Sequence, residues 1–330
     1  MSQWSSDKAG ILLLVIAAVG WYIASRATAD ALSAGKSSPG KTAIGCWIPT
    51  FVVVIAAIVL GRSEVVTSII FGASVAALTI VLGVVTIAAG ETQQTSPRRM
   101  WGFILPAALI CLMIGFTSAI SWFDACVLFL EGLALASLWN DQAEKIPPSR
   151  LSPGRSIQLI IAIAAAVVAT LAGLRGVWDV SGGLGIGDGL VTQVLLGPLL
   201  VLPMIGMGCA AASEGRYDQA VSTLVGYVLL NLCALLPLAA LLWFARPYWT
   251  AVFVTTNAPT TLPATMPAGI ISNPLPYPMG IWRVDTVCLA AIGLLLLPVA
   301  LGRWTLGRAE AVGLMFAYVI YMFLSALLAR

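Results

Sequence analysis

One acidic residue lies in the middle of an apolar stretch, where a carboxyl group could carry chemistry. Glu131 lies within the run Phe129–Leu133 and has no basic neighbour in the sequence. A charge at the centre of a membrane costs at least about 2.5–3.5 kcal/mol, so Glu131 is a functional candidate, either protonated or paired across helices. A structural hydrogen bond is the alternative role. Asp124 and Glu310 stand nearer the ends of their apolar stretches, where water or a helix N-terminus accommodates a carboxylate.

The residue types that are missing exclude most catalytic and metal-binding chemistry. The chain contains no histidine, which excludes imidazole metal sites, histidine proton relays and serine–histidine catalysis. The six cysteines stand singly within apolar stretches without a CxxC pair, so we expect them to pack as small hydrophobic residues. We therefore predict no enzyme, no metal site and no cofactor.

Two distant stretches of the chain repeat one unit. Residues 45–85 and 199–239 align with a displacement of 154 positions and match at a proline, a Gly-Arg pair and an acidic residue. The matched pairs are Pro49/Pro203, Ala57/Ala211, Gly61/Gly215, Arg62/Arg216, Glu64/Asp218, Ser68/Ser222, Gly72/Gly226 and Leu78/Leu232. A duplicated membrane protein places a potential binding site where its two copies meet at mid-membrane.

The composition places these copies in a membrane. Hydrophobic residues make up 60% of the chain and charged residues 9%, with a mean hydropathy of +0.98, which exceeds what one soluble core of this size would bury. Apolar segments of about 20 residues are long enough to cross a bilayer as helices. We expect ten spans, at residues 10–26, 43–60, 65–89, 101–120, 122–139, 156–175, 190–212, 219–245, 284–302 and 309–328.

The basic residues predict the orientation of these spans. If the ten spans alternate, eleven of the 17 Lys and Arg residues fall on one face and six on the other, and the richer face is cytoplasmic. Both termini then lie outside a plasma (inner) membrane, and the segment 140–155 lies in the cytoplasm. Five spans per half turn the second copy over relative to the first. The predicted fold class is therefore an all-α polytopic membrane protein with a 5+5 inverted repeat.

Two polar segments organise the chain. Residues 140–155 are charged and rich in proline, and we interpret them as the linker between a first five-helix repeat, 1–139, and a second, 156–330. Residues 246–283 form a long connection on the outer face, rich in Thr, Pro and Asn, with aromatic residues expected at the level of the lipid headgroups.

Several motifs indicate a family. Residues 215–231 read Gly-Arg-Tyr-Asp-Gln-Ala-Val-Ser-Thr-Leu-Val-Gly-Tyr-Val-Leu-Leu-Asn, and residues 61–72 follow the same pattern more loosely. The fifth and tenth spans open with residues 120–124 and 306–310, and the tenth continues with two tyrosines. These motifs resemble the signatures Gly-x-x-Asp-x-Ala-x-Gly-Asn-x-x-Gly-Ser-Asn-x-x-Asn and Ile-Ser-Arg-x-Glu of the cation/calcium antiporter superfamily, the sodium/calcium exchangers. The resemblance covers most of the chain and implies the ten-helix, inverted-repeat fold of that family.

The chain departs from the family at its ion site. The Pro-Glu pair of the family becomes Pro49-Thr50 in the first copy and Pro203-Met204 in the second, so both signature glutamates are missing. By position, the resemblance implies Thr50, Tyr227 and Asn231 as candidates to bind an ion or substrate, beside Glu131. A dehydrated Ca²⁺ needs about six to eight oxygen ligands, carboxylates among them, so we expect no calcium site.

The paired prolines are candidates for helix breaks. Backbone carbonyls freed near Pro49 and Pro203 would hold a monovalent cation weakly. Simple kinks in packed helices are the alternative.

Two functions remain open from the sequence. The first is a divergent, cation antiporter-like secondary transporter that moves a monovalent cation or a small solute. The second is a non-transporting pseudo-exchanger that serves as a structural or assembly subunit beside partner membrane subunits. A hydrated cavity lined by the candidate residues favours transport, whereas a dry core filled by Trp47, Leu200 and Met204 favours the scaffold. The lipid bilayer is the expected surrounding. No nucleic acid partner is expected, because the net charge of +3 is small and the basic residues are scattered.

Overall fold

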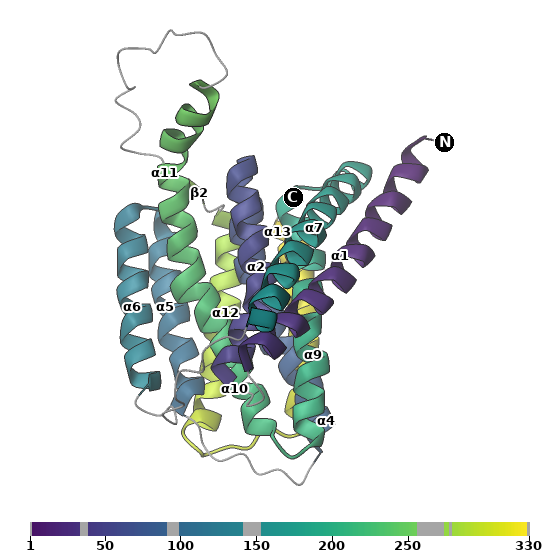
Figure 1. Ribbon diagram of the computed structural model, residues 1–330. Helices are drawn as coiled ribbons and strands as arrows, with labels where there is room; N and C mark the ends of the chain where they lie inside the picture. Colours follow the sequence, from purple (N-terminus) through teal and green to yellow (C-terminus); the bar gives the residue numbers. More distant parts are fainter. Residues whose placement is uncertain are drawn as a thin grey trace.

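Helices make up nearly all of the described chain (Figure 1). The computed structural model describes residues 2–33, 39–90, 99–140, 153–255, 274–276 and 279–328. The longer helices of the first half are α1 (Ser2–Ser33), α2 (Pro39–Leu60), α3 (Ser63–Ala76), α4 (Leu82–Ala89), α5 (Ile104–Ile114) and α6 (Trp122–Asn140). The α-helices of the second half are α7 (Pro153–Leu184), the four-residue α8 (Asp188–Val191), α9 (Gly197–Ser213), α10 (Tyr217–Leu230), α11 (Leu236–Thr255), α12 (Met279–Ala300) and α13 (Arg308–Leu328).

The helices lie where the sequence predicts membrane spans. In the described part of the chain, eight helical stretches are long and apolar enough to cross a membrane, and a shorter apolar stretch covers Trp101–Thr117. Helix α6 follows that stretch and lies beside α5 at one edge of the bundle (Figure 1). Each of the ten expected spans thus falls on a helical stretch, and the all-α polytopic fold class is confirmed.

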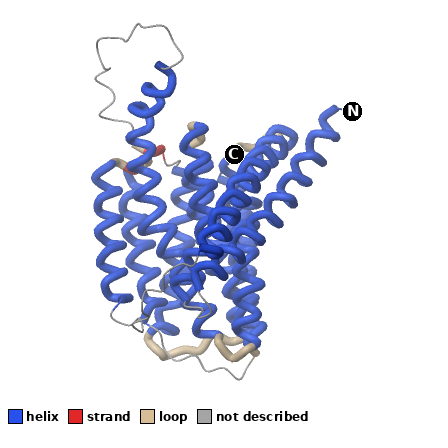
Figure 2. Tube along the Cα trace, in the orientation of Figure 1, coloured by secondary structure: helices blue, strands red, loops and turns tan. Residues whose placement is uncertain are grey.

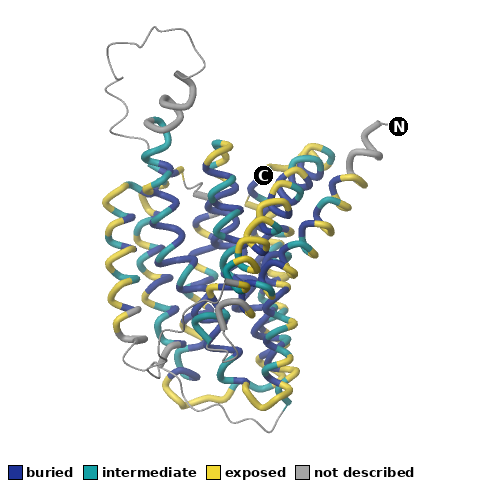
Figure 3. Tube along the Cα trace, in the orientation of Figure 1, coloured by how far each residue is buried: buried dark blue, intermediate teal, exposed yellow. Residues whose placement is uncertain are grey.

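Burial sorts the helices into an inner and an outer set. Helix α3 is buried along nearly its whole length, whereas α1, α6, α7 and α13 carry many exposed positions (Figure 3). Their exposed large apolar residues include Leu130, Ile160 and Phe316. Apolar side chains facing outward suit hydrocarbon, and a helix satisfies its own backbone hydrogen bonds there. The arrangement is that of a bundle surrounded by lipid.

The chain crosses the bundle repeatedly and returns to the end at which it started. The beginning of α1 and the end of α13 lie at one end of the bundle, and α6 finishes at the opposite end (Figure 1). This agrees with termini on a shared face. The assignment of that face to the outside remains a prediction, and most of the predicted linker, residues 141–152, lies outside the described residues.

The sequence repeat has a close structural counterpart. Helices α3 and α10 each contain 14 residues, and their first residues, Ser63 and Tyr217, stand at equivalent positions of the two copies. Each is preceded by a glycine with positive φ, 75° at Gly61 and 78° at Gly215, a conformation that residues with a Cβ avoid. The two glycine turns lie at opposite ends of the bundle (Figure 1). This is consistent with an inverted repeat.

Three π-helical segments interrupt the long helices. The segment η1 (Ala77–Val81) joins α3 to α4, and η5 (Asn231–Leu235) joins α10 to α11 at the equivalent positions of the second copy. The third segment, η4 (Thr192–Leu196), joins α8 to α9. Such wide turns are rare and occur frequently at functional sites.

A short strand pair links the two halves. Strand β1 (Ala119–Ile120) pairs antiparallel with β2 (Leu275–Pro276), with Ala119 opposite Pro276 (Figure 2). The connection predicted for residues 246–283 is shorter than expected, because α11 continues through Pro247 to Thr255 and α12 begins at Met279. A proline costs a helix one hydrogen bond and a bend without ending it when the flanking residues are apolar. Residues 256–273 and 277–278 lie outside the described part.

Candidate functional site

The two copies meet in a hydrogen bond between two of the sequence candidates. Thr50 Oγ1 lies 2.7 Å from the Tyr227 hydroxyl, and both side chains are fully buried. Thr50 comes from α2 of the first half and Tyr227 from α10 of the second. The contact therefore lies where the repeat predicts a site between copies.

Asn231, the first residue of η5, extends this polar contact beyond the end of α10. It follows Tyr227 by one helical turn, on the same face, and its Nδ2 donates to Ser74 Oγ of α3 at 3.2 Å. Asn231 is also fully buried, and its Oδ1 has no hydrogen-bond partner among the described residues. The structure thus brings three of the four candidate ligands, Thr50, Tyr227 and Asn231, into one region built from α2, α3 and α10.

The prolines do not break their helices. Helix α2 passes through Pro49, and α9 passes through Pro203, without interruption, which agrees with the alternative of packed helices and not with helix breaks. A proline removes one i→i−4 hydrogen bond, and in each helix the neighbouring turns keep the α-helical path. The π segments, not the prolines, are where the helical hydrogen-bond pattern changes.

A pocket leads from one end of the bundle toward the Thr50–Tyr227 contact. Its volume is about 340 Å³, and its lining comes from α1, α2, α9 and α10. Arg26, Asp30 and Arg216 line its outer part, whereas Cys46 and Met204 line it further along their helices. Cys46 precedes Thr50 by one turn of α2, so the hydrogen bond lies directly beyond the inner end of the pocket.

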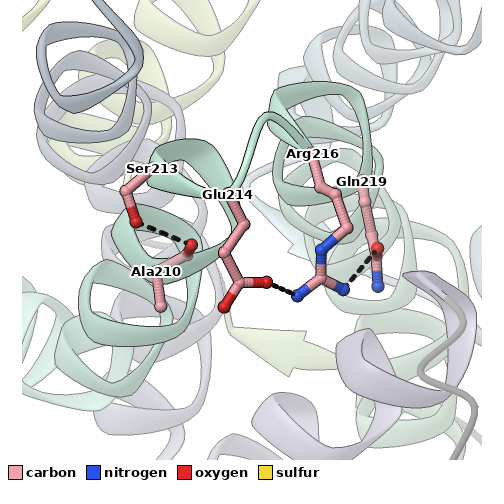
Figure 4. A network of polar contacts seen from close by, with 5 residues as sticks. All are labelled: Ala210, Ser213, Glu214, Arg216 and Gln219. Atoms are coloured by element: carbon pink, nitrogen blue, oxygen red, sulfur yellow. Dashed lines mark hydrogen bonds and ion pairs between the residues drawn. The ribbon is translucent and has the colours of Figure 1, made fainter.

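The mouth of the pocket carries a small polar network (Figure 4). Arg216 pairs with the carboxylate of Glu214 and donates from Nη1 to Gln219 Oε1 at 3.2 Å. Ser213 Oγ donates to the Ala210 carbonyl at 2.9 Å on the preceding turn. Ser213, Glu214 and Arg216 are exposed and Gln219 is half-buried, so the network lies at the surface end of the pocket.

Glu131 lies apart from the other candidates. It is half-buried on α6, which packs against η5 and α11. Both of its carboxylate oxygens are covered and have no hydrogen-bond partner among the described residues. The thiols of Cys111 and Cys233 lie within electrostatic range of it. The structure does not join Glu131 to Thr50, Tyr227 or Asn231.

A second buried carboxyl group was missed by the sequence interpretation. Asp285 is fully buried on α12, where Gln193 Nε2 and the Tyr321 hydroxyl donate to its Oδ1 at 2.5 and 2.8 Å. The predicted ninth span began at residue 284, which placed Asp285 at a span end. The helix begins at Met279, and Asp285 is therefore more than a turn inside it. An aspartate directly followed by Thr-Val-Cys-Leu-Ala-Ala was the available signal.

Comparisons with known proteins agree with this geometry. The model of a family described as sodium/calcium exchanger protein matches residues 155–327, slightly more than half of the chain. A search of curated proteins finds no match.

Solved structures of exchangers share the fold. The crystal structure of the H⁺/Ca²⁺ exchanger CAX aligns over 99% of this chain and 85% of its own, with a TM-score of 0.70 and 14% identity. The sodium-calcium exchanger NCX_Mj, soaked with 10 mM Na⁺ and 10 mM Sr²⁺, aligns over 96% of both chains with a TM-score of 0.61 and 16% identity. Native YfkE aligns over 96% of this chain and 89% of its own, with a TM-score of 0.65 and 14% identity. At these identities the likeness shows a shared fold.

Proposed function

Because the chain belongs to the sodium/calcium exchanger protein family, we propose that it is a divergent secondary transporter that moves a monovalent cation or a small solute. The proposal extends the family membership to a transport activity of this chain and to the residues that would carry it. Thr50, Tyr227 and Asn231 would bind the transported species, and Glu131 would carry a proton or a charge outside that site.

The pocket that leads toward the Thr50–Tyr227 contact, with Cys46 and Leu224 in its lining, is the observation that carries this proposal. Helices α2 and α10 run inward from the pocket mouth, and the next turn after Cys46 and Leu224 presents Thr50 and Tyr227. A cavity open to one side and closed by a contact between two repeats is what alternating access requires of one of its end states.

The available ligands favour a single positive charge or an uncharged solute. Thr50, Tyr227, Asn231 and Ser74 offer neutral oxygens, and the described residues contain no group of three acidic, cysteine or histidine side chains able to hold a metal ion. A dehydrated Ca²⁺ without carboxylate ligands would be prohibitively costly in a buried site. A site built from neutral oxygens alone matches a monovalent cation better than a divalent one.

A second candidate function has one observation in its favour. Leu200 and Met204 are fully buried, and both belong to the core of apolar side chains that surrounds the Thr50–Tyr227 contact. Apolar side chains at these positions of α9 leave one wall of the region without ligands. This favours a pseudo-exchanger that supports partner membrane subunits without transporting.

Uptake into proteoliposomes tests the proposal. The purified chain is reconstituted, and the uptake of labelled Na⁺, Rb⁺ and Ca²⁺ is measured for the wild type and for Asn231→Ala. We expect flux of at least one monovalent cation, no Ca²⁺ flux, and at least a tenfold loss in Asn231→Ala, which is about 1.4 kcal/mol of binding.

The control is Gln158→Ala, which removes an exposed amide from the surface of α7 and is expected to leave the flux unchanged. Absence of flux for every cation and for a panel of small solutes would reject the transporter and leave the scaffold. Ca²⁺ flux that survives in Asn231→Ala would show that another site is used.

A further inference from the structure

We infer that Asp285, with Gln193, Tyr321 and Ser325, forms a second binding site for one positive charge, a proton or a sodium-sized ion. The site lies in the second half of the chain and shares no residue with the Thr50–Tyr227 contact. Its role in transport rests on the proposed function, whereas its occupancy can be measured without any flux.

Three elements converge on the Asp285 carboxylate. Gln193 lies on η4, Asp285 on α12, and Tyr321 and Ser325 on α13. Besides its bond to Asp285, Gln193 Nε2 lies 2.6 Å from the Tyr321 hydroxyl and 3.1 Å from Ser325 Oγ. Gln193 and Asp285 have no exposed surface, and Tyr321 and Ser325 are nearly as buried. The cluster is thus a built polar site inside an apolar bundle.

The cluster holds more acceptors than donors. Asp285 Oδ2 and Gln193 Oε1 are buried and have no hydrogen-bond partner among the described residues. Leaving a buried acceptor unsatisfied costs about 1–3 kcal/mol. The two unsatisfied atoms belong to side chains that are already joined by the hydrogen bond from Gln193 Nε2 to Asp285 Oδ1. A proton on the carboxyl group, or a small cation bound to it, would remove the deficit at Asp285 Oδ2.

The charge of the cluster requires one compensating positive charge. No basic side chain in the described part of the chain forms an ion pair with Asp285. Arg283, two residues earlier on α12, is exposed. The titratable groups around the carboxyl group are the Tyr321 phenol on α13 and the Cys288 thiol one turn further along α12, with Tyr318 in ring contact with Tyr321. None of these supplies a positive charge.

The size of that charge follows from the donor set. An isolated buried carboxylate is prohibitively costly unless a positive charge compensates it. One carboxylate balances one unit of charge, and a divalent ion such as Ca²⁺ would need further carboxylates. The site therefore fits a proton or a monovalent cation.

The position of Gln193 connects this site to the central helix. A Cβ built on Gly72 of α3 would lie 2.8 Å from the Gln193 carbonyl oxygen, so the backbones of α3 and η4 are in direct contact. Gly72 lies on the same helix as Ser74, the partner of Asn231. A change of the Gln193 turn on binding would therefore be transmitted to the helix that borders the first site.

Infrared difference spectroscopy of the full chain in lipid nanodiscs tests the inference. The C=O stretching band of a protonated carboxyl group is followed between two pH values, and then between Na⁺ and choline at constant pH. We expect a band that changes with pH or with Na⁺ in the wild type and that is lost in Asp285→Asn. The matched control is Asp124→Asn, which removes a carboxyl group from the first turn of α6 and should keep the band. A response to pH alone identifies a proton site, and a response to Na⁺ identifies a cation site.

Two results would overturn the inference. One is a band that changes identically in the wild type and in Asp285→Asn. The other is an Asp285-dependent band that stays constant at every pH and Na⁺ concentration, which would show a permanently neutral structural group. If Asp285→Asn does not fold, Tyr321→Phe removes one donor to Oδ1, and we expect it to shift the band and its midpoint. A failed flux assay with a responsive band would reject transport and keep the site.

Discussion

Replacing Tyr227 by phenylalanine removes one partner of the 2.7 Å hydrogen bond between the repeats and leaves the ring in place. An intramolecular hydrogen bond contributes a net of about 0.5–1.5 kcal/mol, and pairs within membrane proteins average about 0.6 kcal/mol with a maximum near 1.7. The unpaired Thr50 hydroxyl can turn to the carbonyl one helical turn earlier, which limits the penalty. We therefore expect Tyr227→Phe to lower the free energy of unfolding by about 1 kcal/mol.

A double-mutant cycle with Thr50→Val isolates the contact. Unfolding in mixed micelles with increasing dodecyl sulfate, followed by tryptophan fluorescence, gives the free energy of each variant. The coupling energy is expected at about 0.6–1.7 kcal/mol. Tyr22→Phe is the control, because Tyr22 lines the pocket with an exposed ring and its substitution should change little.

Additive effects of the two substitutions would contradict the expected coupling. A coupling energy within about 0.3 kcal/mol of zero is the behaviour of independent sites. It would show that the hydrogen bond between Thr50 and Tyr227 contributes no measurable free energy to stability. The transport proposal would then lose the contact that closes the pocket.

Three further predictions concern the turns and the ion. Gly61→Ala should destabilise the protein by about 1–2 kcal/mol, because φ is 75° there, whereas the flexible guanidinium of Arg246 next to it can move aside. Gly313→Ala, with open space around it, should cause no such loss in the same unfolding assay. Arg62→Gln should cost less than about 1 kcal/mol, because its 3.6 Å ion pair with Asp188 is partly exposed, and the difference should shrink at high salt; a salt-independent loss would contradict this. Added Ca²⁺ should leave the free energy of unfolding unchanged, since no carboxylate lies at the Thr50–Tyr227 contact, and a concentration-dependent rise would reveal a calcium site.

The repeat and the helices could be predicted because they depend on local patterns. The two copies match at a proline, a glycine turn and an acidic residue 154 positions apart. In the structure, α3 and α10 start at equivalent residues and change to π geometry at equivalent residues. Gly61 and Gly215 could be identified as turns because glycine is the residue that most readily adopts the positive φ of a tight turn. The candidates Thr50, Tyr227 and Asn231 came together because they occupy positions defined by that register.

The parts that could not be predicted depend on contacts between distant segments. Asp285 lies near the start of an apolar stretch, and only the packing of η4 and α13 against α12 shows that it is deeply buried. The pairing of β1 with β2 joins residues more than 150 positions apart through two-residue strands, which have no periodic signal. For Pro49 and Pro203 the sequence left a helix break and a simple kink as alternatives, because only the packing around each buried proline decides whether its helix continues.

The π segments at Ala77–Val81 and Asn231–Leu235 give each long inner helix one surplus residue at matching positions of the two copies. If such a surplus moved along the helix, only one turn of backbone hydrogen bonds would rearrange at each step. Each step would rotate the side chains that it passes by about 100°, the angle per residue of an α-helix. Asn231 is the first residue of its segment, so a single step would swing its amide out of register with Ser74 without moving the ends of the helix.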